Sequence, residues 1–348
     1  MLVYQKIIKP LLFSLDAEKA HRLAFASLKI ARNIPGLFSI IEYQFSVNNK
    51  LLGKNYLGLN FPNPIGLAAG FDKNAELIDE WFKLGFGFVE IGTVTPRPQV
   101  GNPAPRLFRL PKDSALINRM GFNNKGMDEV YKNLDSKNSG GVVGVNIGKN
   151  KDTPNEKAYQ DYIKCFETLH PNADYFVINV SSPNTPGLRE LQEKEPLLKI
   201  ISEVQNINFG LQKKKPILLK IAPELNTNQI EDIAYISEQT KLDGIVATNT
   251  STGRFGLNAS SEVLNSIGNG GLSGKPVKEI STQIIKKLKE VLPANNIIVG
   301  CGGIFNYDDV KEKSIAGADL FQIYTGFVYE GPGIVKNILK DYLKEIHE

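Results

Sequence analysis

A short loop over residues 179–187 carries the side chains best suited to chemistry in this chain. An apolar run, Tyr175 to Val180, predicts a buried strand that ends at this loop. The amides of Asn179 and Asn184 bracket the hydroxyl of Ser182, and two prolines stiffen the backbone around them. The predicted site is therefore fixed in shape, rich in hydrogen-bonding groups and free of a permanent charge at its centre. Such a site suits a small polar substrate that loses a proton and a hydride.

Lys220 is a second candidate, because it lies inside the apolar run Ile217 to Ile221. Burying an unpaired ammonium group is costly, so a lysine there needs a reason. One reason is a positive charge beside an electron-accepting ring, which is how proteins tune a flavin. The other is structural: a lysine that reaches solvent or forms an ion pair.

Glycine-rich segments indicate a phosphate site. Gly302-Gly303 and Tyr324-Thr325-Gly326 follow two apolar runs near the end of the chain, and glycines let backbone N–H groups approach phosphate oxygens. A predicted helix starting at Tyr307 would add a favourable dipole. Ordinary turn glycines remain the alternative interpretation.

Further polar candidates are spread along the chain. Asn118, Asn184 and Asn249 could meet an amide-rich ring that bears a carboxylate from several sides, and Lys73 could bind its carboxylate or carbonyl as a point charge.

These residues must be positioned by a repeating strand–loop–helix pattern that begins near residue 64. Eight short apolar runs alternate with helical segments, which indicates a parallel β/α architecture, and eight strands close a barrel. The alternative, a doubly wound sheet, requires an early Gly-x-Gly-x-x-Gly turn, and none is present. We therefore predict a (β/α)8 TIM barrel with long loops over 95–125 and 249–275. The eight predicted strands are 64–68, 88–91, 142–147, 175–180, 217–221, 244–248, 297–301 and 320–323.

The first 45 residues differ from the rest. Apolar residues from Tyr4 to Leu15 follow helical spacing, and Asp16 could cap a second helix. This segment holds six Lys or Arg against three acids, a balance of +3 out of the net +4 of the chain. Two short helices with apolar faces and basic flanks suit an anionic membrane interface. A packed extension of the core is the alternative.

Composition excludes several functions. The 348 residues fit one barrel-sized domain with an extra piece, and no basic stripe interleaved with aromatics supports nucleic-acid binding. Two distant cysteines, Cys165 and Cys301, and three histidines support neither a disulfide framework, a metal centre nor an iron–sulfur cluster. No apolar stretch is long enough to cross a bilayer and no signal peptide is evident, so we expect a bacterial protein on the cytosolic side.

The motifs together resemble those of the class 2, quinone-dependent dihydroorotate dehydrogenases over almost the whole chain. The serine at position 182 supports class 2, because class 1 relatives place cysteine there and lack the N-terminal helices. The matching segments are 69–73, 91–99, 101–109, 118–123, 179–191, 248–250, 270–274 and 322–326, with 20–24 in the N-terminal helices.

The resemblance implies oxidation of (S)-dihydroorotate to orotate in pyrimidine (UMP) biosynthesis, with hydride transfer to FMN and reoxidation of the flavin by a membrane quinone. It implies Ser182 as the general base, whose proton would leave through water or Thr250. The implied substrate residues are Lys73, Asn118, Arg119, Met120, Gly121, Phe122, Asn179, Asn184, Asn249 and Thr250. The implied FMN contacts are Ala69, Gly70, Phe71, Asp72, Lys73, Thr93, Asn146, Asn179, Lys220, Thr248, Gly274, Gly303, Tyr324 and Thr325.

The resemblance also places His21, Arg109 and Tyr324 near a quinone tunnel framed by the N-terminal helices. We expect residues 1–45 to form this membrane extension and 46–348 the catalytic barrel. The protein would be peripheral on the cytoplasmic face of the inner membrane, with no iron–sulfur partner subunit. Two alternatives remain: a class 1-like flavin barrel that uses fumarate or NAD, and a non-enzymatic barrel that binds only a phosphate ligand and membrane.

Overall fold

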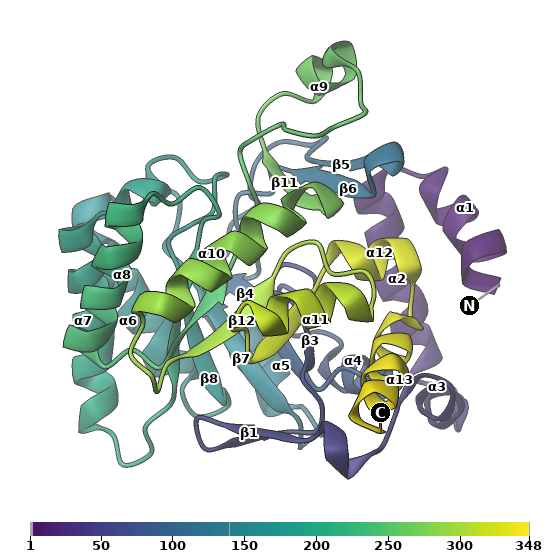
Figure 1. The fold of residues 1–348 in the computed structure, drawn as a ribbon, viewed down its shortest axis with the longest axis horizontal. Coiled ribbons are helices and arrows are strands. Elements are labelled where there is room, and N and C mark those ends of the chain that lie inside the picture. Colours follow the sequence, from purple (N-terminus) through teal and green to yellow (C-terminus); the bar gives the residue numbers. More distant parts are fainter. Residues whose placement is uncertain (1–2, 139, 348) are drawn as a thin grey trace.

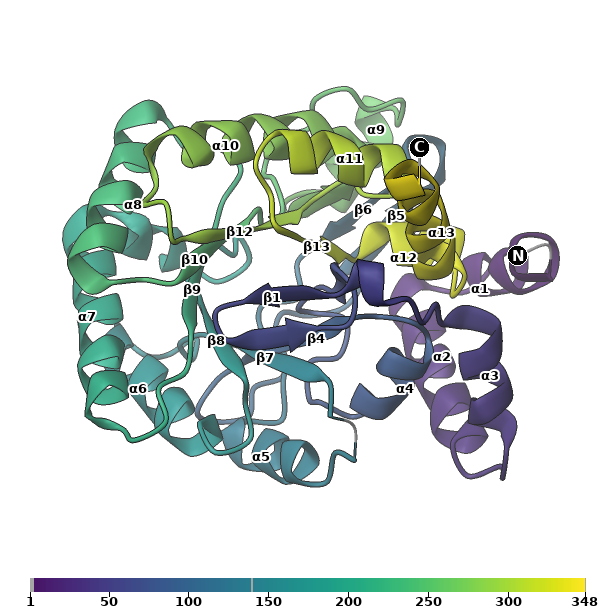
Figure 2. The same cartoon turned by 60° about the horizontal axis from the view of Figure 1, so that its bottom comes forward.

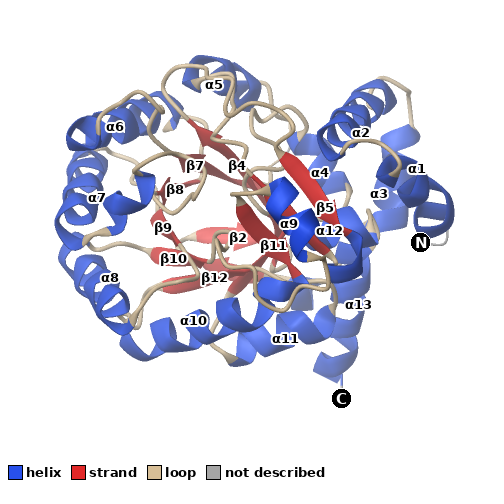
Figure 3. Cartoon of the chain, turned by 90° about the horizontal axis from the view of Figure 1, so that it is seen from above, coloured by secondary structure: helices blue, strands red, loops and turns tan. Residues whose placement is uncertain are grey.

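Eight parallel strands form a closed barrel at the centre of the molecule, as Figure 3 shows from above. The structure is a computed structural model that describes residues 3–138 and 140–347. Around the barrel the strands follow the order β10-β12-β13-β3-β4-β7-β8-β9. All eight predicted strands are confirmed, so the doubly wound alternative is excluded. Their bounds are β3 (Ile65–Leu67), β4 (Phe88–Val94), β7 (Val142–Ile147), β8 (Tyr175–Asn179), β9 (Ile217–Ile221), β10 (Gly244–Ala247), β12 (Ile297–Cys301) and β13 (Leu320–Ile323).

Helices surround the barrel and connect consecutive strands (Figure 1). Two of them, α8 and α11, begin with capping boxes in which Asn226 and Asn306 accept hydrogen bonds from backbone N–H groups. The outer helices are α4 (Ile78–Lys83), α5 (Met127–Asp135), α6 (Ala158–Leu169), α7 (Lys194–Gly210), α8 (Thr227–Thr240), α10 (Lys278–Val291), α11 (Tyr307–Ile315), α12 (Thr325–Glu330) and α13 (Ile334–His347). Short 3-10 turns lie at Lys50–Leu52, Pro111–Asp113, Asn155–Lys157, Leu188–Gln192 and Lys275–Val277.

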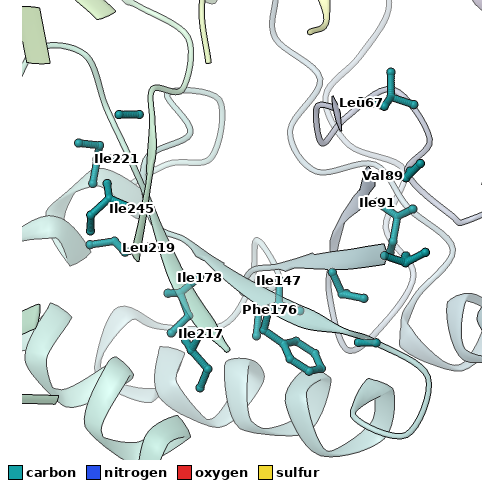
Figure 4. Close-up of a cluster of buried hydrophobic side chains, with 14 of the residues drawn as sticks. Leu67, Val89, Ile91, Ile147, Phe176, Ile178, Ile217, Leu219, Ile221 and Ile245 are labelled. Atoms are coloured by element: carbon teal, nitrogen blue, oxygen red, sulfur yellow. The ribbon is translucent and has the colours of Figure 1, made fainter. Parts of the chain in front are cut away.

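Strand alternation decides which side chains face the inside of the barrel. Ile217, Leu219 and Ile221 of β9 point outward into the core between strands and helices, which Figure 4 shows for several strands. Leu218 belongs to the separate cluster inside the barrel. Lys220, two residues after Leu218, therefore also faces inward. The two-residue period of β9 thus places the Lys220 ammonium inside the barrel, near the carboxyl end of the strand.

The two long loops pair with each other, which the sequence did not predict. Strands β5 (Leu107–Leu110) and β6 (Ala115–Asn118) come from the first loop, and β11 (Gly271–Gly274) from the second. They form a three-stranded antiparallel sheet beside the barrel mouth, with α9 (Ser261–Ile267) above it (Figure 1). At the opposite end, a hairpin of β1 (Lys54–Tyr56) and β2 (Leu59–Phe61) crosses the bottom of the barrel, which Figure 2 turns toward the viewer.

The N-terminal segment lies against one side of the barrel as three helices rather than the two predicted (Figure 2). A π-helical turn (Tyr4–Ile8) leads into α1 (Lys9–Phe13), and α2 (Ala17–Ala31) begins at Asp16, which caps it as predicted. The third helix, α3 (Leu37–Phe45), was expected only as an apolar cluster, and Gly36 with φ of +77° permits the reversal before it. Within the described residues, no helix combines the length and apolar character needed to traverse a bilayer.

Candidate active site

A cavity at the carboxyl ends of the barrel strands brings most of the predicted site residues together. Strand ends of a β/α barrel all open on one face, so residues distant in sequence converge there. The predicted residues that line the cavity are Ala69, Gly70, Lys73, Thr93, Asn118, Met120, Gly121, Phe122, Asn179, Ser182, Asn184, Lys220, Thr248, Asn249, Thr250, Gly274, Gly303, Tyr324 and Thr325.

A network of amides and hydroxyls forms one wall of this cavity. Asn179 Nδ2 donates hydrogen bonds to Thr93 Oγ1 at 2.9 Å and to Asn146 Oδ1 at 3.0 Å. Asn249 Nδ2 donates to Asn179 Oδ1 at 3.3 Å and to Ser181 Oγ at 3.0 Å. Because these bonds use the side chains against one another, the network fixes their orientation before any ligand binds.

Ser182 lies on the loop after β8, with its side chain buried at the cavity wall. The backbone N–H of Asn184 donates to Ser182 Oγ at 3.3 Å, and Asn184 Nδ2 donates to Asn118 Oδ1 at 3.0 Å. Arg189 holds the loop from behind, since its guanidinium donates to the carbonyls of Ser181 and Thr250. The serine hydroxyl is therefore presented to the cavity by a braced loop.

Glu90 is a buried partner of Lys220 that sequence reasoning missed. Lys220 Nζ lies 3.6 Å from Glu90 Oε1, and the Glu90 side chain is fully buried. Asn146 Nδ2 donates to Glu90 Oε1 at 2.8 Å, and Gln322 Nε2 donates to the other oxygen. Lys220 is thus ion-paired, as the structural interpretation predicts, and it also lines the cavity, while its role beside an electron-accepting ring stays a prediction. An acid inside the apolar run 88–91 was the available signal.

Lys73 contributes a second positive charge to the cavity. Its ammonium donates to the carbonyl of Gly70 at 2.7 Å. Burial, together with the nearby Arg106 guanidinium, lowers the pKa of Lys73 to about 8, although Glu18 and Asp72 act in the opposite direction. This lysine is mostly a cation at neutral pH and is the charged group placed to bind a carboxylate.

The glycine segments after β12 and β13 form a cradle. A Cβ at position 303, where φ is +72°, would lie 2.5 Å from Lys278 Cβ, and one at position 326 would collide with the carbonyl oxygen of Ile304. Side chains are therefore excluded at these two positions beside the cavity, and the Thr325 hydroxyl donates to Ser273 Oγ at 2.8 Å. The residues present fit a phosphate group.

The helix assigned to this cradle needs correction. The N-terminus of α11 at Tyr307 is already capped by Asn306, carries two aspartates in its first turn and does not line the cavity. The helix whose first residue faces the cavity is α12, which begins at Thr325. The first turn of α12, rather than that of α11, therefore lies at the cavity.

Four of the residues predicted to contact FMN or the substrate do not line the cavity. Asp72 accepts hydrogen bonds from the N–H groups of Glu76 and Leu77 and from Trp81, so its carboxylate holds the chain before α4. The Arg119 guanidinium donates to carbonyls of Pro105, Ile267 and Asn269 and braces the neighbouring loops. Asn146 acts behind Asn179, and the ring of Phe71 faces a second cavity.

That second cavity lies between the N-terminal helices and the barrel, has a volume of about 550 Å³ and is almost entirely apolar. His21, Arg109 and Tyr324 all line it, and Tyr324 also lines the first cavity. Burial and Lys73 lower the pKa of His21 to about 4, so this histidine is neutral at physiological pH. Arg109 stacks over the ring of Phe13 at 4.6 Å and donates to the carbonyl of Leu15.

Comparison with known proteins agrees with this arrangement. Residues 51–346 match the model of the dihydroorotate dehydrogenase family. The chain is 50% identical over 343 residues to dihydroorotate dehydrogenase (quinone) of Christiangramia forsetii, covering 99% of both chains. It is 46% identical over 344 residues to the Shewanella oneidensis protein of that name, covering 98% of this chain and 99% of the relative.

A solved structure shows the same fold. The crystal structure of DHODH from Eimeria tenella with ferulenol superposes with a TM-score of 0.85 and 37% identity, covering 95% of this chain and 91% of that one. The relatives named for a quinone exclude the class 1-like alternative and the non-enzymatic one. The chain therefore belongs to the dihydroorotate dehydrogenase family, in its quinone-dependent class.

Proposed function

We propose that this member of the family binds FMN in the barrel-mouth cavity, uses Ser182 as general base on (S)-dihydroorotate, and passes the electrons to a membrane quinone. Oxidation of dihydroorotate in pyrimidine biosynthesis, and a flavin as cofactor, follow from the family. The single observation behind the finer proposal is one cavity that unites Ser182, several amides, two lysines and a glycine cradle.

The glycine cradle and Lys220 define where FMN fits. The backbone around Gly303 and Thr325 would hold its phosphate, and Lys220 would lie beside its ring system. When bound, FMN supplies the hydride acceptor and the link to the quinone. Glu90 keeps the Lys220 ammonium in place at the cavity floor, so the charge is positioned before the cofactor arrives.

The remaining groups suit dihydroorotate. Asn118, Asn184 and Asn249 present amides from three separate strand ends, and Lys73 offers a cation for the substrate carboxylate. Ser182 then takes the proton from the ring carbon. A serine hydroxyl is a weak base unaided, so it needs a route for its own proton.

Thr185 is a second candidate for that route, beside Thr250, which lines the cavity. The Thr185 hydroxyl is buried three residues after Ser182 and has no hydrogen-bond partner among the residues described. The Thr250 hydroxyl already lies 3.5 Å from Asn249 Oδ1. We propose that a water molecule between Ser182 and Thr185 carries the proton away.

The second cavity supports the quinone step. Its apolar lining matches a lipid-soluble molecule, and Tyr324 connects it to the barrel-mouth cavity. Of the nineteen large apolar side chains exposed on the described residues, ten lie between Val3 and Tyr43. With the basic flanks, this surface suits an anionic membrane. We propose that residues 1–45 are the membrane extension of a catalytic barrel, on the cytoplasmic face of the inner membrane.

The pKa of Lys73 gives a pH prediction. Because a carboxylate binds the protonated lysine, affinity for orotate should fall as pH rises through about 8 and the cation is lost. Above that pH the dissociation constant should rise by up to about tenfold per pH unit. Titrating orotate against the flavin absorbance at several pH values measures it. Lys73→Met should bind weakly with no such dependence; an equal pH dependence in this variant would contradict the role.

The proposed function is tested by the absorbance of the purified protein. We expect a yellow protein that releases FMN on denaturation and loses its flavin absorbance when dihydroorotate is added without oxygen. Adding a quinone in detergent should restore the colour. A colourless protein that does not take up FMN, or a yellow one that dihydroorotate does not bleach, would refute the proposal.

A further inference from the structure

Lys313 of α11 is a buried lysine that none of the steps above uses. Its side chain is 0% exposed. The ammonium contacts Ser281 Oγ at 3.0 Å, Thr282 Oγ1 at 3.1 Å and the carbonyl oxygen of Lys278 at 3.4 Å, all neutral acceptors. Among the residues described, no carboxylate forms an ion pair with it. A buried cation without an anionic partner is costly to keep.

The contacts of the Lys313 ammonium link it to the glycine cradle. Its three acceptors belong to the first turn of α10, and Ser281 Oγ in turn donates to the carbonyl of Cys301 at 2.7 Å. Cys301 is followed directly by the cradle glycines, and Cβ positions built at 302 and 303 would contact Ser281 and Lys278 respectively. Lys313 therefore lies immediately behind the cradle, linked to it through one serine.

Two acidic groups on α11 pair with another lysine and do not neutralise the charge of Lys313. Lys278 Nζ engages Asp309 at 3.1 Å and Glu312 at 2.9 Å, so both of these acids of α11 are already paired. Burial lowers the pKa of Lys313 to about 8, with Cys301, Glu312 and Asp309 opposing that shift and Lys278 adding to it. The ammonium is destabilised in the ligand-free protein, and a dianion in front of the glycines would offset that cost.

We propose that Lys313 is a positioning residue for the cofactor phosphate, and that its charge makes the cradle select FMN over unphosphorylated riboflavin. This inference rests on the proposed use of FMN. The ammonium acts at a distance, through a dry layer formed by Ser281 and the cradle glycines, where a charge is weakly screened. Lys313 also fastens α11 to the start of α10, whose Ser281 is bonded to the carbonyl of Cys301 directly before the cradle.

A purely structural role predicts a different outcome. If Lys313 only fastened α11 to α10, its loss would loosen the whole cavity. Riboflavin and FMN, which share the ring system and differ in the phosphate, would then lose affinity alike. The ratio of their affinities separates the two roles.

The experiment uses the full chain stripped of flavin, with FMN and riboflavin titrated by fluorescence quenching. Lys313→Gln removes the charge and keeps a hydrogen-bonding group for Ser281 and Thr282, whereas Lys313→Arg keeps the charge. Lys287→Met, at an exposed position on α10, controls for net charge. We expect Lys313→Gln to lower FMN affinity about tenfold relative to riboflavin. The Lys313→Arg variant is expected to retain most of the ratio, and the surface control all of it.

An unchanged ratio of FMN to riboflavin affinity in Lys313→Gln overturns the inference. If riboflavin binds too weakly to titrate, inorganic phosphate as a competitor of FMN replaces it. Its inhibition constant should rise about tenfold in Lys313→Gln, and a constant equal to the wild-type value overturns the inference equally. If Lys313→Gln does not hold its fold by circular dichroism, Lys313→Met, which also removes the charge and keeps a side chain of similar length, is titrated instead with the same expected ratio. A wild-type protein that binds no FMN refutes the proposed function itself.

Discussion

Replacing Ser182 by alanine is expected to slow reduction of the bound flavin by dihydroorotate about 10²–10⁴-fold, the usual effect of removing a general base. The hydroxyl lies at the cavity wall on the braced loop after β8. Flavin content should stay at the wild-type level, because the cradle and Lys220 lie on other strands. Anaerobic stopped-flow measurement of the flavin absorbance reports the step directly.

The neighbouring serine provides the matched control. Ser181 is also buried, but its hydroxyl accepts a hydrogen bond from the Asn249 amide, and the residue does not line the cavity. Ser181→Ala removes two hydrogen bonds, one from Asn249 and one to Asn179, worth about 1 kcal/mol each, and leaves Ser182 in place, so it should slow reduction only several-fold. Equal rates for Ser182→Ala and the wild type would refute the role of Ser182. Equal losses in the two variants would assign the effect to the loop as a whole.

Filling the apolar cavity is expected to block quinone reduction while sparing the first half-reaction. Ala24 of α2 lines this cavity, and a tryptophan there would occupy space that a quinone needs. We expect reduction of a quinone in detergent to fall at least about tenfold, as the apolar contacts made by the quinone are lost. Bleaching of the flavin by dihydroorotate should be unchanged, because Ser182 and the amides lie in the other cavity.

Ala26 offers the control on the same helix. It is exposed and does not line the cavity, so Ala26→Trp adds the same apolar bulk without closing the passage. Its quinone activity should match the wild type. Deleting residues 1–40 should likewise preserve FMN binding and abolish most quinone reduction. Full quinone activity in Ala24→Trp and in the truncated protein would exclude this cavity as the quinone path.

The sequence by itself determined the barrel and the identity of most of the lining residues. Strand alternation and helical spacing are local properties, so eight apolar runs alternating with helices were readable one by one. Because strand ends in this architecture meet on one face, polar residues such as Asn179 and Lys220 could be assigned to a common site. The cap at Asp16 was predictable for the same local reason.

Only the tertiary structure decided which side chains contact one another. Glu90 and Lys220 are 130 residues apart and meet because both face into the closed barrel. Asn118 reaches Asn184 because two long loops pair as a small sheet, a long-range contact without a periodic signal. Pairing across the fold also turned Arg119 away from the cavity, put α12 rather than α11 at the cradle, and left Lys313 buried behind it. Local periodicity fixes which face a residue occupies, whereas its partner across the barrel depends on how the whole chain closes.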